Sequence, residues 1–124
     1  MDVSEVIRKK GMIEILAELQ EGNKTFTQIM NAVRLSMSNI VARLREAEAY
    51  RLINRIATLN EGKVEVKYTL SDKGNNVLRK IMENPEIGGI LKECRSVKRK
   101  ANEIEKKLDE ILNNIKFDLS GVAV

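Results

Sequence analysis

The sequence contains no histidine, a single cysteine and few aromatic residues among its 124 positions. Histidine is the commonest general base and metal ligand in proteins, and neither a glycine-rich phosphate loop nor a nucleophile elbow is present. We therefore predict that the protein is not an enzyme and that it binds no metal ion and no cofactor. Cys94 has no second cysteine with which to form a disulfide within the chain, and we interpret it as a small buried side chain rather than a redox sensor.

Long apolar segments are also missing. No apolar run approaches the roughly 20 residues that span a bilayer, and the N-terminus lacks the apolar stretch of a signal peptide. We therefore expect a cytoplasmic protein with no membrane partner. Aromatic residues make up 3% of the chain and hydrophobic residues 43%, so its core should be aliphatic. The net charge of +4 is compatible with a polyanionic partner but does not by itself indicate one.

Hydrophobic spacing predicts three helices in the first 50 residues. A first helical segment runs from Val3 to Gly22, with an interruption near Gly11. A short second helix has Thr27 as its N-cap and ends near Val33, and Ser36 caps a longer third helix. These two helices form a helix-turn-helix pattern. The third helix is amphipathic: the inward set is Ile40, Val41, Leu44 and Ala47, and the outward set is Arg43, Arg45, Glu46 and Glu48.

After Tyr50 the hydrophobic pattern changes from helical to alternating, which predicts a β-hairpin turning at residues 60–62. In its second strand the apolar face is Val64, Val66, Tyr68 and Leu70, and the wet face is Lys63, Glu65, Lys67 and Thr69. Ser71 then caps a fourth helix that ends near Met82. The order of helix, helix, helix, strand, strand, helix predicts a mainly α winged helix-turn-helix of the α+β type.

Five segments carry a resemblance to a known family. They are MIEILAEL (12–19), FTQI (26–29), the third helix (36–44), LINR (52–55) and YTLSDKG (68–74). Together and in this order they resemble winged-helix transcriptional regulators of the HxlR, MarR and ArsR group, with HxlR-like chains the most similar. The most specific part is the Tyr-x-Leu-Ser-x-Lys-Gly pattern. The resemblance covers roughly residues 10 to 82 and implies transcriptional regulation through DNA binding.

The chain departs from the HxlR pattern at two places. The family usually has glycine where Arg51 stands, so Arg51 or its neighbour must adopt a left-handed backbone at the end of the third helix. HxlR-like chains also usually carry an N-terminal cysteine, which this sequence lacks. Thiol-based sensing by that route is therefore not expected.

Asn84 and Pro85 mark the start of a long final helix, as N-cap and first helical residue. Its apolar residues are spaced alternately by three and four, as in a coiled coil. This helix would be on the order of 40 Å long, too long for one small domain to cover. We therefore predict a homodimer formed by this seam, which comprises Ile87, Ile90, Cys94, Val97, Ala101, Ile104, Leu108, Ile111 and Ile115. Its direction is open, because Glu105 would meet Lys100 in a parallel pair and Lys98 in an antiparallel one.

The third helix is the expected DNA reader, because in winged-helix proteins the N-terminal half of this helix lies in the major groove. The residues predicted to contact bases are Met37, Ser38, Asn39, Ala42 and Arg43. The residues predicted to contact the DNA backbone are Arg34, Ser36, Arg45, Lys63 and Lys67. The alternative for these polar residues is that they cap the helix or are solvated surface groups.

The sequence thus predicts a winged-helix DNA-binding domain (1–84), a coiled-coil dimerisation helix (85–116) and a short tail (117–124). The expected function is that of a homodimeric regulator of transcription that binds double-stranded DNA at an inverted repeat, because two linked domains present two recognition helices. The alternative is a winged helix that binds other proteins and has no affinity for DNA. That alternative predicts an apolar outer face on the third helix, where only Met37 fits it well.

Overall fold

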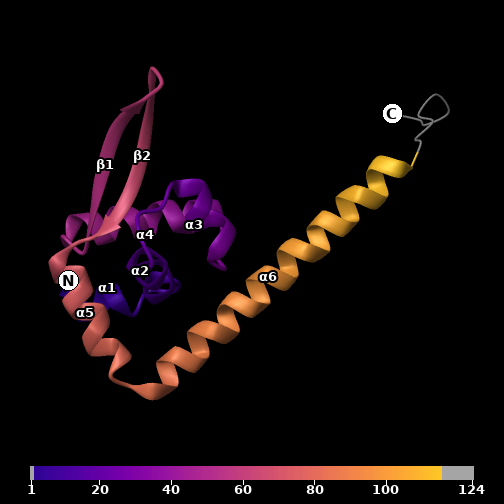
Figure 1. The fold of residues 1–124 in the computed structure, drawn as a ribbon. Helices are drawn as coiled ribbons and strands as arrows, with labels where there is room; N and C mark the ends of the chain where they lie inside the picture. Colours follow the sequence, from indigo (N-terminus) through magenta and orange to yellow (C-terminus); the bar gives the residue numbers. More distant parts are fainter. Residues whose placement is uncertain (1, 116–124) are drawn as a thin grey trace.

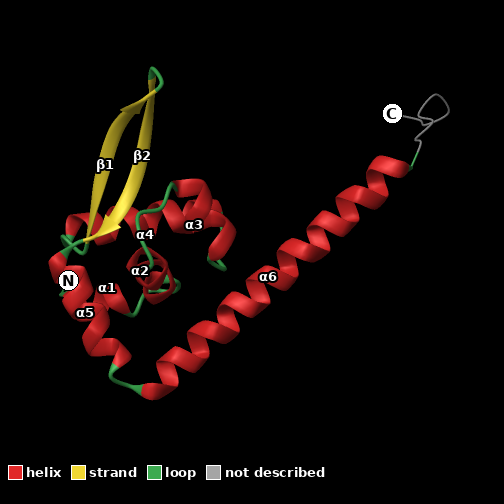
Figure 2. Cartoon of the chain, in the orientation of Figure 1, coloured by secondary structure: helices red, strands yellow, loops and turns green. Residues whose placement is uncertain are grey.

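The computed structural model describes residues 2–115 and shows a winged helix followed by one long helix (Figure 1; Figure 2). The elements are α1 (Val3–Ile7), α2 (Met12–Gln20), α3 (Phe26–Ala32), α4 (Met37–Ala49), β1 (Ile53–Asn60), β2 (Lys63–Leu70), α5 (Asp72–Met82) and α6 (Pro85–Asn114). The two strands form one antiparallel hairpin. The predicted α+β winged-helix fold and the long C-terminal helix are confirmed.

The first helical segment is divided into α1 and α2 at Gly11. This glycine precedes α2 with a φ of +82°, in the left-handed region that residues with a side chain rarely adopt. A Cβ atom at this position would also lie 2.2 Å from a methyl carbon of Leu35. Both constraints make the tight turn between α1 and α2 dependent on glycine.

Side-chain caps define the starts of the later helices. The cap of α3 is Thr25 rather than the predicted Thr27, because Thr25 and Gln28 form a reciprocal capping box. The hydroxyl of Thr25 accepts from the amide of Gln28 at 3.2 Å, and the side chain of Gln28 accepts from the amide of Thr25 at 2.9 Å. The predicted caps Ser36, Ser71 and Asn84 each accept a backbone hydrogen bond at the start of α4, α5 and α6.

The core of the winged helix is aliphatic, as predicted, and draws on every element from α1 to α5 except β2. Its buried members are Val6, Met12, Ile15, Leu16, Leu19, Ile29, Val33, Ile40, Leu44, Ala47, Leu52, Ile53 and Leu78. Val41, which was expected to face this core, is only half-buried and lies on the side of α4 near the hairpin. The residues of α4 that pack into the core are therefore Ile40, Leu44 and Ala47.

The end of α4 is tied to the start of α5. Arg51 has a φ of +60°, so it adopts the left-handed conformation expected after this helix. The hydroxyl of Ser71 donates to the carbonyl of Arg51 at 2.5 Å and accepts from the amide of Gly74 at 2.9 Å. A Cβ atom at Gly74 would lie 2.0 Å from the carbonyl oxygen of Leu52, so only glycine fits there. The Ser-x-Lys-Gly part of the motif therefore fixes the base of the hairpin.

The hairpin projects from the domain as a wing (Figure 2). Its strands pair from Ile53 with Leu70 to Asn60 with Lys63, and Glu61 and Gly62 turn the chain with φ of 52° and 79°. The predicted apolar face of β2 is covered only near its base, where Tyr68 and Leu70 pack against the core. At the tip, Leu59 and Val64 are 75% and 71% exposed. The hairpin extends beyond the elements that could bury them.

α6 contacts the domain as far as Asn102, and its far end extends away from the domain (Figure 1). The guanidinium of Arg95 lies 3.2 Å from the carboxylate of Glu18 and 2.6 Å from that of Glu21. Further along, the side chain of Asn102 donates to the carbonyl of Asn31 at 2.9 Å. These contacts join α6 to α2 and α3.

The predicted seam on α6 is uncovered in the single chain. None of the residues of α6 is buried, and the exposed seam residues are Ile90, Val97, Ala101, Ile104, Leu108, Ile111 and Ile115. Ile87 and Cys94 are half-buried. Cys94 was expected to be a small buried side chain, but it has a polar neighbour: its Sγ accepts a hydrogen bond from the guanidinium of Arg34 at 2.8 Å. The predicted tail (117–124) and residue 116 lie outside the described residues.

Candidate nucleic-acid interface

The N-terminal end of α4 presents small polar side chains to solvent. Ser38 and Asn39 are exposed, Met37 is 58% exposed and Ala42 is half-buried. Ser36 precedes them, and its hydroxyl accepts from the amide of Asn39 at 3.3 Å. The cap uses the Ser36 hydroxyl and the backbone amide of Asn39, so the side-chain amide of Asn39 is left at the surface. That amide can both donate and accept, which is the requirement for pairing with adenine.

Arg43 was expected to face outward, and this prediction is wrong. Its side chain is 16% exposed and turns toward the loop between α1 and α2. The Nε atom donates to the carbonyl of Lys10 at 3.0 Å, and the guanidinium also pairs with the carboxylate of Glu46. Glu46, also expected outside, is half-buried and meets the ammonium of Lys9 at 2.5 Å.

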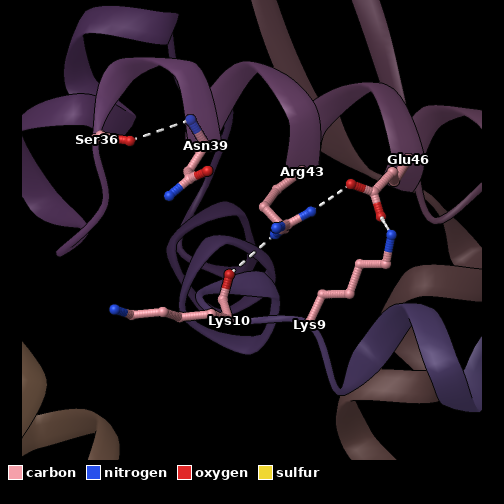
Figure 3. A network of polar contacts seen from close by, with 6 residues as sticks. All are labelled: Lys9, Lys10, Ser36, Asn39, Arg43 and Glu46. Atoms are coloured by element: carbon pink, nitrogen blue, oxygen red, sulfur yellow. Dashed lines mark hydrogen bonds and ion pairs between the residues drawn. The ribbon is translucent and has the colours of Figure 1, made fainter.

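These contacts form a network that braces α4 against the loop between α1 and α2 (Figure 3). The network consists of Lys9, the carbonyl of Lys10, Arg43 and Glu46. Because it leaves the side chain of Lys10 exposed, the network also places a cation beside α4. Figure 3 shows this side chain extending toward the N-terminal end of the helix. Lys10 is not among the contacts predicted from the sequence, because its neighbours in the chain do not indicate that it lies beside a helix about 30 residues further on.

Arg34, a predicted backbone contact, is held on the side of the domain that faces α6. Its guanidinium lies 3.2 Å from the carboxylate of Glu14 and 2.8 Å from the sulfur of Cys94. Glu14, and then Cys94, raise the pKa of Arg34 above its usual value, so this side chain stays charged. Arg34, in the loop between α3 and α4, therefore joins that loop to α2 and α6, and it is not a free surface cation.

Arg45 lies where the outer face of α4 approaches the wing. It is exposed, and it forms none of the ion pairs found within residues 2–115. Arg45 lines a hollow of about 170 Å³ together with Arg55 and Tyr68. Arg55 is 59% exposed, and its Nε lies 3.8 Å from Glu48. Arg55 is not among the contacts predicted from the sequence, although its place opposite Tyr68 in the hairpin register gives it a position near α4.

The wing carries the last two predicted backbone contacts. Lys63 is exposed beside the turn, and Lys67 is 42% exposed with its ammonium 3.8 Å from the carboxylate of Glu65. Both lie on the strand face opposite Val64 and Val66. In the hairpin register Lys67 lies opposite Ile56, whereas Arg55 lies on the other face with Val64 and Val66. Both faces of the wing therefore combine cations with aliphatic side chains.

No helix within the described residues combines the length and the apolar character of a membrane-spanning segment.

Comparison with known proteins gives consistent results. Residues 6–88 match the family model described as HxlR-like helix-turn-helix. The chain is 36% identical over 89 residues to an uncharacterized HTH-type transcriptional regulator of Methanocaldococcus jannaschii, covering 68% of this chain and 76% of that protein.

Solved structures show the same fold. The reduced form of the transcriptional regulator YodB from B. subtilis is 26% identical with a TM-score of 0.60, covering 64% of this chain and 78% of that one. A possible HxlR family transcriptional factor from Thermoplasma volcanium is 21% identical with a TM-score of 0.63, covering 75% and 84%. At that level of identity the second likeness concerns the fold alone.

Proposed function

Because this chain belongs to the HxlR-like helix-turn-helix family of transcriptional regulators, we propose that it binds double-stranded DNA as a homodimer and regulates transcription from an inverted repeat. In this proposal α4 enters the major groove and the wing contacts the backbone. The observation that carries it is the exposed polar end of α4, held in a fixed orientation by the buried side of the helix and by Arg43.

The proposed base contacts are Ser38 and Asn39, with Met37 and Ala42 available to touch a thymine methyl. Arg43 acts as a positioning residue, because its guanidinium is engaged with the carbonyl of Lys10 and with Glu46. The proposed phosphate contacts are Arg45, Lys63 and Lys67, together with the newly identified Lys10 and Arg55. These side chains neutralise phosphates without reading sequence.

The homodimer is proposed through the seam on α6, whose exposed aliphatic residues lie beyond the reach of their own domain (Figure 1). Two domains joined in this way present two copies of α4 to one face of the duplex. The symmetry of the dimer then requires a site with the symmetry of an inverted repeat.

The direct test is a salt titration of binding to a selected duplex and to a random duplex, with binding measured by fluorescence anisotropy. Asn39→Ala should weaken binding to the selected duplex by about 1–3 kcal/mol at one base position and leave binding to random DNA unchanged. The matched control is Asn76→Ala, the same change at an exposed position on α5. Equal losses on both duplexes would contradict base reading by Asn39.

The alternative function, a module that binds only proteins, makes a different prediction for the same titration. It requires no measurable affinity for either duplex at low salt. The exposed Leu59 and Val64 on the wing are the apolar groups that such a module would offer. The polar end of α4 and the cations around it favour DNA, so binding that weakens steeply with salt is the expected result.

A further inference from the structure

A cavity lies at the start of the seam, between α6 and the loop that joins α1 to α2. Its volume is about 270 Å³, and its apolar lining comes mainly from Ile7, Ile13, Ile87, Ile90 and Leu91. Ile90 belongs to this lining and also to the exposed seam. The cavity and the seam are therefore one continuous apolar surface, which begins in the domain and runs out along α6.

The rim of this cavity is basic. Arg8, Lys9, Lys10 and Arg34 line it, against a single acidic residue, Glu14. Glu14 is paired with Arg34, and Lys9 is paired with Glu46, so within the described residues the unpaired positive charge of the rim comes from Arg8 and Lys10. An occupant that is apolar on one side and acidic on another would therefore match both the lining and the rim.

Charge is unevenly distributed along α6. Residues 92–100 contain five basic side chains and one acidic one, namely Lys92, Arg95, Lys98, Arg99 and Lys100 with Glu93. Residues 103–110 contain four acidic side chains and two basic ones, namely Glu103, Glu105, Asp109 and Glu110 with Lys106 and Lys107. The C-terminal end of a helix also carries a negative partial charge. The far end of α6 is thus acidic on its polar side and aliphatic along its seam.

We propose that two copies of the chain pair their α6 helices in antiparallel directions, and that the far end of the partner's α6 covers this cavity. The inference rests on the homodimer of the proposed function and assigns its geometry. In an antiparallel coiled coil, alternate seam positions face one another. Setting Ala101 against the partner's Ile104 brings Val97 to the partner's Leu108 and Ile90 to the partner's Ile115. This register uses the seam from Ile90 to Ile115.

A parallel pair would bring the basic segment of each helix beside the same segment of its partner. It would also leave each cavity without the far end of a helix to cover it. The antiparallel pair sets the acidic segment (103–110) of each helix beside the basic segment (92–100) of the other, and it places the apolar end of the helix, from Ile111 to Ile115, over the cavity. Lys98, Lys100 and Glu105 do not decide the direction, because Glu105 meets a lysine in either.

Disulfide cross-linking distinguishes the two directions. In a Cys94→Ser background, which removes the native thiol, three variants are compared: Val97→Cys, Leu108→Cys, and both changes together. In the antiparallel pair, position 97 of one chain faces position 108 of the other. The two copies of position 97 are therefore separated by 11 residues along the helices, about 16 Å, and so are the two copies of position 108. A disulfide needs Cα atoms within about 7 Å, so neither single variant should cross-link. The double variant should form a covalent dimer under mild oxidation.

Light scattering on the same variants before oxidation separates the outcomes. A dimer in which only the double variant cross-links supports the proposal. A dimer in which each single variant cross-links efficiently establishes a parallel pair and overturns it. A dimer in which no variant cross-links places the interface away from this pairing and also overturns it; it contradicts the seam as the dimer interface but not DNA binding by a dimer. A chain that is monomeric at micromolar concentration contradicts the dimer of the proposed function itself.

Discussion

At the residue scale, Arg43 and Asn39 both differ from the role that their residue type suggests. Arginine is the commonest partner of guanine, but Arg43 is turned toward the carbonyl of Lys10 and the carboxylate of Glu46. Asn39 is an ordinary capping type, yet Ser36 provides the cap and the amide of Asn39 remains at the surface. Which of the two side chains is free at the surface depends on neighbours from the loop between α1 and α2.

Arg43→Ala should therefore lower stability as well as DNA binding. A hydrogen bond that involves a charged group contributes about 1.5–3 kcal/mol, so we expect a loss of about 1–3 kcal/mol in the free energy of unfolding, measured by urea denaturation. Binding should weaken to a similar degree on selected and random duplexes, since α4 loses its brace. Arg45→Ala is the control: its stability should be unchanged and its salt slope reduced by about one unit. Unchanged stability for Arg43→Ala would contradict the bracing role.

At the element scale, the starts of the helices depend on which hydroxyl faces the free amides. Thr25 and Thr27 are both followed by plausible helical residues, and a short pattern does not rank them. The structure selects Thr25 because Gln28 stands three residues later and completes the capping box. The result adds two residues, Phe26 and Thr27, to the start of α3, and Phe26 packs against the core.

Thr25→Ala should destabilise the domain by about 1 kcal/mol, the usual contribution of an N-cap. Thr27→Ala should leave stability nearly unchanged, because Thr27 is an exposed residue inside α3 and alanine favours helix. Thermal unfolding followed by circular dichroism compares the two variants directly. A larger loss for Thr27→Ala would restore the cap that the sequence pattern suggested.

At the scale of the whole molecule, α6 is the element that a single chain cannot complete. Its 30 residues extend about 45 Å, and its hydrogen bonds and ion pairs with the winged helix reach as far as Asn102. The remaining seam exposes Ile104, Leu108 and Ile111, with fractions of 66%, 54% and 58%. Aliphatic side chains in such a row indicate a surface that is buried in an assembly.

Ile104→Asp should dissociate the proposed dimer, because it places an unpaired charge in a dry interface at two symmetry-related positions and costs several kcal/mol. The winged helix has its own core, so most of the helical signal should survive in circular dichroism. DNA affinity should fall steeply because the two half-sites are no longer bound as a linked unit. Lys106→Asp, on the side of α6 away from the seam, is the control and should remain dimeric in light scattering.

The sequence alone determined the fold and the family of this protein. Hydrophobic periods of 3.6 and 2 are local, and the Ser36, Ser71 and Asn84 caps stand at fixed distances from the segments they start. Gly11 and Gly74 are also visible in the sequence, although the atoms they approach, the side chain of Leu35 and the carbonyl of Leu52, belong to distant residues. The elements, their order and the HxlR-like resemblance therefore followed from the residues in sequence.

Only the tertiary structure decided which side chains are free to act. Arg34 is engaged by Glu14 and Cys94, and Arg43 by Lys10, because packing brings together partners that lie 20 to 60 residues away in sequence. Glu46, three residues after Arg43 on α4, completes the contact. The same packing sets the exposed side chain of Lys10 beside α4 and leaves the tip of the wing uncovered. It also set the start of α6 beside a basic cavity. Helical spacing gives a residue its face, whereas its availability depends on what the rest of the chain places against that face.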